Sequence, residues 1–324
     1  MVQCAVQAEP TRSNSLRRVD MQARMKQFVS LATVVGFLFL LPIGAHAVDL
    51  RVTCGGKHAP STINGALKLL NPAFPNTLTV SGTCNENVLI QSFNGLTLVA
   101  KTGATISDAS GGTGVVVNIQ GSTNVTLRGF TINGGAFGVF CGYSFCRFDG
   151  NTVQGASQAG VQVVQSRATF DTNTIQNNLI GITSLESSSV RSNGGLVVRQ
   201  NQSSGVVVDT GSSFAAFGTN IQDNSYAGIE AQFASLLVND SSITGNLFGV
   251  LALNHTEASL AGDVITGNGL NGVVVRDLSF VLFGGPSNIT GHPSGLDVDC
   301  QPQFPATRGA LTNIGGGTTN CVEP

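Results

Sequence analysis

The feature of this chain that most restricts its fold is an internal repeat. A glycine followed by valine, isoleucine or leucine recurs every 21 to 24 residues through the second two thirds of the 324-residue sequence. An isoleucine or valine stands six or seven residues before each of the last eight of these glycines, so that two marks keep the same phase. Such a repeat is typical of a solenoid. The glycines are Gly114, Gly138, Gly160, Gly181, Gly205, Gly228, Gly249, Gly272 and Gly295.

Two classes of solenoid have repeats of this length, namely leucine-rich repeats and parallel β-helices. Leucine-rich repeats need a leucine-dominated strand, whereas these repeats consist mainly of Val, Ile, Thr, Ser, Gly and Asn. The segment 114–295 shows no helical spacing of apolar residues. With no Trp and only two Tyr, the core must be built from small and β-branched residues, which favour strands. The repeat therefore predicts an all-β fold, a parallel β-helix of about ten coils.

A polar residue follows the second mark by three positions in six consecutive repeats. Asparagine tolerates the left-handed backbone of a tight corner, and stacked asparagines can hydrogen-bond to their counterparts one coil away, about 4.8 Å along the axis. The spacing predicts an asparagine ladder at one corner, with the histidine as its last rung rather than as a catalytic residue. The six residues are Asn178, Asn201, Asn224, Asn246, Asn268 and His292.

The repeats, together with the upstream segments Thr77–Ile90 and Gly95–Ala100, resemble the right-handed parallel β-helix proteins of the pectin-lyase-like superfamily. The resemblance covers about residues 50 to 300. Because this architecture hosts lyases, hydrolases, epimerases, adhesins and proteins with no known reaction, the resemblance predicts the fold and leaves the activity open.

The resemblance also implies a short helix that closes the N-terminal end of the coils. A helix there would cover the unpaired edge of the first coil, which otherwise invites aggregation. Apolar residues after Pro60 and Ser61 have the matching spacing. They are Ile63, Ala66, Leu67 and Leu70.

The first 47 residues indicate export. An apolar run at 28–41 follows Arg24 and Lys26 and precedes a small-x-small sequence that ends at Ala47, as in a cleaved signal peptide. The alternative, a membrane anchor, needs roughly 20 apolar residues. We expect a secreted or periplasmic protein with no membrane span in its mature part. The predicted organisation is a dispensable upstream segment (1–24), a signal peptide (25–47) and one β-helix domain (48–324), divided into cap (48–76), coils (77–300) and tail (301–324).

Six cysteines follow the predicted cleavage site, which suggests disulfides in an exported chain. They form three local couples, and we favour pairing within each couple, although the sequence leaves the connectivity open. A metal site is the alternative, but the chain has no C-x-x-C motif and its remaining histidines are scattered. The favoured pairs are Cys54–Cys84, Cys141–Cys146 and Cys300–Cys321.

Candidate functional residues come from the strand that follows each phasing glycine. Its first and third residues are small or apolar and should point inward, so the second and fourth should point outward. Asp209 and Glu230 lie on neighbouring coils of this face, where stacking would place them about 8 Å apart, within the range of inverting glycosidases. They are candidates for a catalytic acid and base. Gln232 and Arg276 occupy the same outward columns and complete a candidate ligand-binding strip.

Known chemistries of the superfamily fit poorly. A pectate-lyase-like mechanism needs calcium-binding carboxylates beside a basic residue, and here Asp297 and Asp299 are the sole carboxylate pair on one such strand. They are candidate calcium ligands, and no other cofactor is expected. A polygalacturonase-like mechanism needs an Asp trio with His-Gly and Arg-x-Lys, and these motifs are missing from the mature chain.

The composition and these missing motifs favour a binding protein. After residue 47 the chain has 11 Lys and Arg against 16 Asp and Glu, which argues against a nucleic-acid binder. We expect a non-catalytic surface solenoid that binds a polysaccharide or a cell-surface glycan. The alternatives are a polysaccharide lyase or glycoside hydrolase with a non-standard site, and a structural or assembly role. The outward face is also rich in apolar residues, which a ligand, a partner or the chain's own loops and C-terminal tail would cover.

Overall fold

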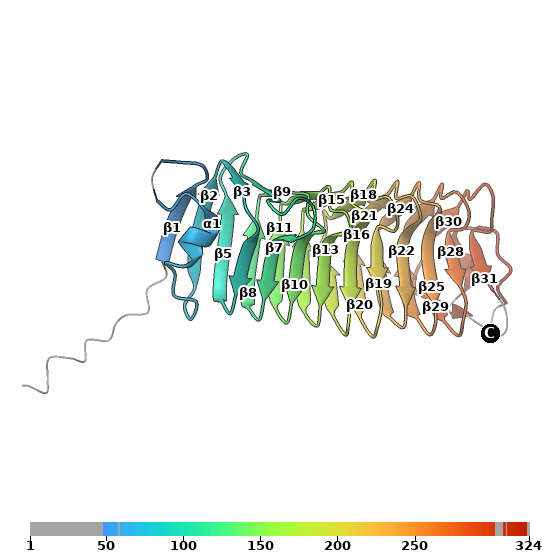
Figure 1. Cartoon of the computed structure of the whole chain (residues 1–324). Helices are drawn as coiled ribbons and strands as arrows, with labels where there is room; N and C mark the ends of the chain where they lie inside the picture. Colours follow the sequence, from blue (N-terminus) through green and yellow to red (C-terminus); the bar gives the residue numbers. More distant parts are fainter. Residues whose placement is uncertain (1–47, 58, 302–306, 309, 323–324) are drawn as a thin grey trace, which may run out of the picture. The chain divides into compact units, whose positions relative to one another are not determined.

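The coils of this chain wind three parallel sheets around one apolar interior. The computed structural model describes residues 48–324 apart from 58, 302–306, 309 and 323–324; the predicted upstream segment and signal peptide lie outside the described residues. Within the described part, each full coil adds one strand to sheet C, then one to sheet A, then one to sheet B (Figure 1). The prediction of an all-β parallel solenoid of about ten coils is confirmed.

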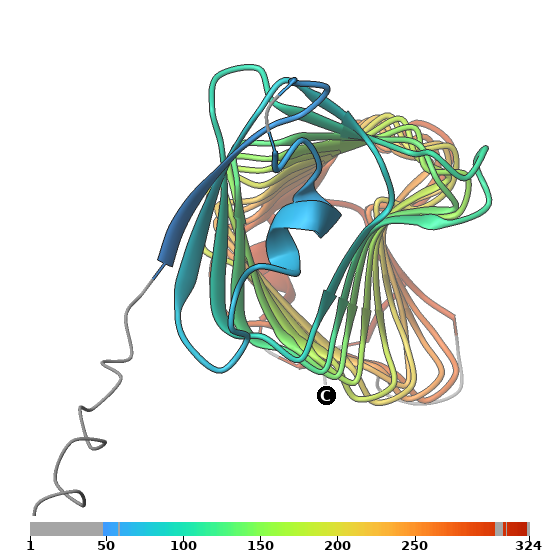
Figure 2. The same ribbon diagram turned by 60° about the vertical axis from the view of Figure 1, so that its left-hand side comes forward.

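Figure 2 looks more nearly along the coils and shows the three sheets around their interior. Sheet A contains β1 Val48–Thr53, β2 Asn76–Ser81, β5 Asn94–Ala100, β8 Thr123–Arg128, β11 Phe145–Asp149, β14 Arg167–Asp171, β17 Ser189–Ser192, β20 Ser213–Phe217, β23 Ser235–Asn239, β26 Glu257–Ala261, β29 Phe280–Phe283 and β32 Thr307–Arg308. Sheet B contains β3 Thr83–Asn85, β6 Thr105–Ser107, β9 Thr131–Asn133, β12 Thr152–Gln154, β15 Thr174–Gln176, β18 Val197–Arg199, β21 Asn220–Gln222, β24 Ser242–Thr244, β27 Val264–Thr266 and β30 Asn288–Thr290. Sheet C contains β4 Val88–Gln91, β7 Val115–Gln120, β10 Phe137–Gly142, β13 Ala159–Val164, β16 Ile180–Leu185, β19 Val206–Val208, β22 Ala227–Gln232, β25 Phe248–Leu253, β28 Val273–Val275 and β31 Val298–Cys300.

Both sequence marks now have a physical explanation. The second mark is the central residue of each sheet B strand, as in the register Ile132–Val153–Ile175, and it is buried. The phasing glycine begins each sheet C strand and lies directly against the next coil. At Gly228 a Cβ atom would lie 2.5 Å from Cγ2 of Ile243 and 2.8 Å from the carbonyl oxygen of Gly249. The glycine is therefore required because the backbones approach closely, and not because of a left-handed φ.

The last coil does not follow the repeat as the sequence predicts it. Val273 pairs with Val298, and the Val273 amide donates to the carbonyl of Asp297, so that Asp297 holds the place expected for Gly295. Val298 is fully buried, whereas Leu296, expected to point into the core, is partly exposed. The assignment of Leu296 as an inward residue is therefore wrong, because the chain takes two more residues to reach this strand.

The asparagine ladder is present at the corner between sheets B and C. In each rung the side-chain amide donates to the side-chain oxygen of the next coil, at 3.2 Å from Asn178 to Asn201 and 2.9 Å from Asn201 to Asn224. The backbone amide of each rung donates to the same oxygen. These side chains are buried, so the ladder satisfies the polar groups of a corner that water does not reach.

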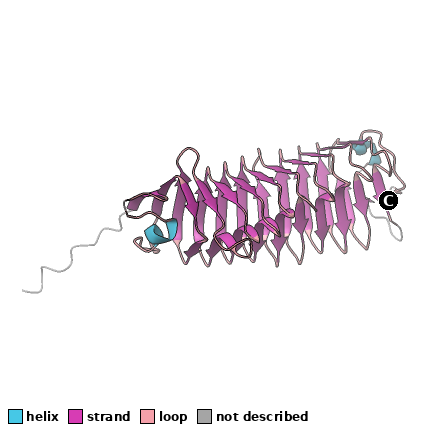
Figure 3. Cartoon of the chain, turned by 45° about the horizontal axis from the view of Figure 1, so that its top comes forward, coloured by secondary structure: helices cyan, strands magenta, loops and turns pink. Residues whose placement is uncertain are grey.

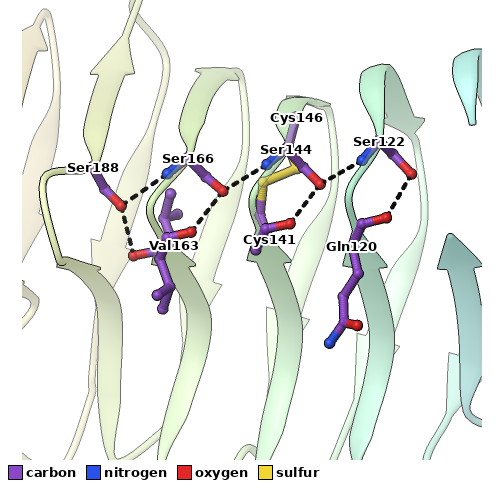
Figure 4. The surroundings of a disulfide bond; sticks show 10 residues. Gln120, Ser122, Cys141, Ser144, Cys146, Val163, Ser166 and Ser188 are labelled. Carbon is purple, nitrogen blue, oxygen red and sulfur yellow. Dashed lines mark hydrogen bonds between the residues drawn. A yellow bond between two sulfur atoms is a disulfide. The ribbon is translucent and has the colours of Figure 1, made fainter. Parts of the chain in front are cut away.

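A second ladder, of serines, follows the corner between sheets C and A. The backbone amide of each coil donates to the serine hydroxyl of the next, at distances between 2.9 and 3.2 Å (Figure 4). Ala234 stands where the next hydroxyl would be and interrupts the series. The Cys141–Cys146 disulfide spans this corner across the rung of Ser144. The ladder consists of Ser122, Ser144, Ser166, Ser188 and Ser212.

The third corner, between sheets A and B, carries a mixed series that includes one carboxylate. Asp263 is fully buried, and its two oxygens accept from the backbone amides of Ser241 and Ala261. Burial raises the pKa of Asp263 to about 7 against the effect of these two hydrogen bonds, and the charge of Asp240 adds to the rise. Asparagine holds the equivalent corner at Asn151 and Asn173.

Helix is scarce in the described residues (Figure 3). The helix expected at the N-terminal side is α1 (Ile63–Leu67), and the hydroxyl of Thr62 caps it by accepting from the amide of Gly65. A 3₁₀ helix, η1 (Leu311–Ile314), lies near the C-terminus. Among the residues that the structure describes, no helix has the length and apolar character needed to cross a membrane.

Three disulfides join Cys54 to Cys84, Cys141 to Cys146 and Cys300 to Cys321, the pairs favoured from the sequence. The C-terminal tail packs over the last coil, as expected. The Val298 amide donates to the carbonyl of Thr318, and the side chain of Asn313 donates to the carbonyl of Phe283.

Candidate functional site

The predicted strip on the outward face of sheet C consists of residues that already have partners. Glu230 pairs in register with Val207 and Leu251, and its carboxylate accepts from the hydroxyl of Ser204 at 2.8 Å. Asp209 lies in the neighbouring column, opposite Gln232, and its carboxylate accepts from the next backbone amide in the chain. Asp209 and Glu230 are thus on neighbouring coils but in different columns.

The other two members of the strip are separated by an apolar coil. Gln232 accepts from the side chain of Asn254 at 3.2 Å, and Arg276 forms an exposed ion pair with Asp277 at 3.3 Å. Between their coils lie Leu251 and Leu253, both buried. The four side chains share one face, but apolar residues interrupt the strip between Gln232 and Arg276.

The candidate calcium ligands Asp297 and Asp299 have separate environments. Asp297 is buried; it binds Nδ1 of His292 at 2.6 Å and accepts from the backbone amide and hydroxyl of Thr318. Burial opposes its ionisation, but the bonds from Thr318 and His292 outweigh this, and the pKa of Asp297 lies below its usual value. Asp299 accepts from Asn320 and Gln301. Each carboxylate thus fastens the C-terminal tail.

His292 is the last rung of the ladder, as predicted. Its side chain is fully buried, and Nε2 lies 3.3 Å from the side-chain nitrogen of Asn268. Every earlier rung donates its side-chain amide toward the next coil, so Nε2 acts as acceptor and the proton lies on Nδ1, toward Asp297. This residue terminates the ladder and links it to the tail.

Among the described residues, one group of three side chains has metal-ligating atoms close together, namely Cys54, Cys84 and Glu86. The two cysteines form a disulfide. The carboxylate of Glu86 accepts from the backbone amides of Ile63 and Asn64 at the start of α1. This group therefore has a structural role.

The outward face of sheet A carries a polar network that sequence reasoning missed. Arg128 and Arg147 form ion pairs with Asp149 and Asp171, at 2.9 and 3.0 Å. The side chain of Asn193 donates to Asp171 and accepts from Arg191, which extends the network across β8, β11, β14 and β17.

Two arginines of this face lie over aromatic rings. The guanidinium carbon of Arg167 is 5.7 Å from the ring centre of Phe145, and that of Arg191 is 4.3 Å from the ring centre of Phe217. We call these four residues the arginine face. The arginines are 24 residues apart, a signal of one coil that becomes informative only once the strands of sheet A are in register.

The comparisons with known proteins agree with this fold. Residues 76–250 match the family model described as periplasmic copper-binding protein (NosD). No curated protein matches the chain. The A-module of the Azotobacter vinelandii mannuronan C-5 epimerase AlgE6 has 16% identity and a TM-score of 0.54, over 87% of this chain and 91% of that one.

Two bacteriophage structures have similar coils. The tailspike protein 2 domain of bacteriophage CBA120 has 12% identity and a TM-score of 0.60, over 84% of this chain and 45% of that one. The Dettilon tailspike protein has 10% identity and a TM-score of 0.57, over 78% and 56%. At these identities the likeness concerns the fold. Since the family model spans more than half of the sequence and its match lies within the coils, this chain belongs to the NosD family of right-handed parallel β-helix proteins.

Proposed function

We propose that this chain is an exported β-helix protein that binds a polysaccharide on its outer surface without transforming it. The observation that carries the proposal is the state of the candidate catalytic carboxylates. Glu230 is held by Ser204, Asp209 by its own backbone turn, and Asp297 by His292 and Thr318. General acid–base catalysis on a glycosidic bond needs two carboxyl groups that face one substrate, and none of these groups is arranged for that task.

Export agrees with the rest of the molecule. The family is described as periplasmic, the sequence begins with a predicted signal peptide, and three disulfides suit an oxidising compartment. We place the protein in the periplasm or outside the cell.

Both ends of the coils carry elements that suit a free-standing scaffold. At the N-terminal end, Asn64 of α1 accepts from the amide of Leu89 and donates to the carbonyl of Asn87, groups of the first sheet C strand and the turn before it. We propose that α1 is the N-terminal cap. The C-terminal tail covers the other end, so both ends would resist edge-to-edge pairing.

The family description mentions copper, and the residues here fit that metal poorly. Copper is held by imidazole, thiolate or thioether groups. The described cysteines are all in disulfides, and the three methionines lie within the first 47 residues. Of the described histidines, His292 is committed to Asp297 and Asn268, and His255 stacks on Phe233. The proposed function therefore uses no copper.

A panel of polysaccharides tests the proposal directly. The secreted chain should be retained by at least one immobilised polysaccharide and should release no reducing ends or unsaturated uronides from any of them, with or without calcium. Retention is read by affinity electrophoresis and release by reducing-sugar and absorbance assays on the same samples. Product release that depends on the chain would show that it is an enzyme, and absence of retention throughout would remove the binding function.

A double variant tests the strip on sheet C. Asp209→Asn with Glu230→Gln should leave retention and the melting temperature nearly unchanged, because both carboxylates already have partners within the fold. Loss of retention with unchanged melting would instead assign the ligand to this strip, whose role as a binding site stays a prediction.

A further inference from the structure

The arginine face of sheet A carries positive charge that the fold does not neutralise. Arg128 and Arg147 on the same sheet each have a carboxylate partner. Arg167 and Arg191 have none among the described residues; their recorded contacts are the rings of Phe145 and Phe217 and, for Arg191, the amide of Asn193. Two exposed guanidinium groups without counter-charge therefore lie on adjacent coils.

The register places these two groups close to each other. Arg167 pairs with Ser189, and Arg191 lies two residues further along the same strand, β17. Diagonal neighbours of this kind have Cβ atoms about 7–8 Å apart. Arg147 occupies the same column as Arg191, two coils away, with Thr169 between them. The three cations thus run along the axis of the coils.

The aromatic rings prepare the arginines for a planar anion. A guanidinium group that stacks on a ring uses its flat face and leaves its N–H groups free at the edge, where they can bind a carboxylate through two parallel hydrogen bonds. The Nε of Arg191 is fixed by Asn193 at 2.7 Å, which holds that guanidinium in place. The ring of Phe145 is 48% exposed and offers an apolar surface beside the cations, of the kind on which sugar rings pack.

We propose that the arginine face binds an acidic polysaccharide, with Arg167 and Arg191 contacting carboxylate groups of successive sugars and Phe145 contacting a sugar ring. This inference rests on the proposed function and names its ligand class and its site. An acidic polysaccharide is favoured over a nucleic acid because the chain as a whole carries more acidic than basic residues after residue 47, which opposes binding to a polyanion of high charge density.

The test compares two double variants that remove the same charge from different faces. R167Q/R191Q removes the two unpaired arginines of sheet A. R199Q/R276Q is the matched control, since Arg199 contacts Gln176 on sheet B and Arg276 pairs with Asp277 beyond sheet C. A third variant, R167K/R191K, keeps the charge but loses the planar fork. The probes are polygalacturonate, its fully methyl-esterified form, dextran and double-stranded DNA, each with the secreted full chain.

We expect the parent chain to bind polygalacturonate and not its methyl ester, and to lose affinity as salt rises. R167Q/R191Q should weaken this binding by roughly tenfold for each arginine, and R167K/R191K should also weaken it. R199Q/R276Q should stay within about twofold of the parent. Unchanged circular dichroism and melting temperature in all variants would show that folding is not the cause.

Each contrary result has a definite meaning. Equal binding by both glutamine variants would overturn the site, and binding of dextran or methyl ester alone would overturn the ligand class, while either result leaves the proposed function standing. Equal binding of DNA and polygalacturonate would show a general polyanion surface and overturn the inference. Binding to no polysaccharide at all would overturn the proposed function together with it.

Discussion

Replacing Gly228 with alanine should lower the free energy of unfolding by about 2–4 kcal/mol. The new methyl group would lie 2.5 Å from a core atom of Ile243 and 2.8 Å from the backbone oxygen of Gly249, so that two coils must separate to admit it. The effect should reach the neighbouring coils, because each coil of a solenoid is stabilised by the coils beside it. The shift of the denaturation midpoint, followed by circular dichroism, measures the loss.

Gly284 provides the matched control. A Cβ atom at this position would find its nearest neighbour, the hydroxyl of Ser259, at 3.8 Å, which is an ordinary contact. Gly284→Ala should therefore leave the midpoint within experimental error. If Gly228→Ala were as stable as the parent, close approach of the coils would not explain the phasing glycines.

The second large effect concerns Asp263. A carboxyl group whose pKa is about 7 in the folded chain and 3.8 when unfolded binds more protons in the folded state between these values. Stability contributed at this site is therefore fully present below pH 4 and falls as pH rises toward and beyond 7. We expect the parent chain to lose about 2 kcal/mol between pH 5.5 and 8.5 from this group.

The variant Asp263→Asn should remove most of this pH dependence and be more stable than the parent at pH 8.5. Asparagine suits the corner, since Asn173 in the equivalent position donates to the carbonyls of Phe148 and Asp171. Asp223→Asn, at an exposed position, removes the same charge and should leave the slope unchanged. Unfolding measured across this pH range decides the matter. A parent slope no steeper than that of the variant would mean that Asp263 ionises normally.

Much of the fold could be predicted because period and phase are properties of the sequence itself. The glycine and isoleucine marks identify sheets C and B, and the asparagine ladder and the three disulfides follow from spacing. The serine ladder was also visible, since Ser122, Ser144, Ser166 and Ser188 are each 22 residues apart. Serine is common on exposed turns, so this spacing does not by itself reveal that the hydroxyls are buried.

The candidate site was harder to predict for physical reasons. The partner of Glu230 is Ser204, 26 residues earlier and on the previous coil, a distance that matches no simple repeat. The environment of Asp297 depends on Thr318 in the tail, where the repeat has ended. The arginine face depends on the relative register of sheet A strands, whose corner turns vary in length from coil to coil. Side-chain chemistry that arises from stacking appears only when the coils are assembled.

The one-way direction of the asparagine ladder makes the middle of this chain modular. Each rung presents an acceptor to the preceding coil and a donor to the following one, so the two faces of a coil such as Gly205–Ala227 are complementary, and a duplicate inserted there would find the same partners on both sides. His292 accepts from one side and commits its other nitrogen to the tail, so growth beyond it is blocked. The protein could thus change length in steps of about 4.8 Å, like a ruler with one fixed end, while its interior and both termini stay the same.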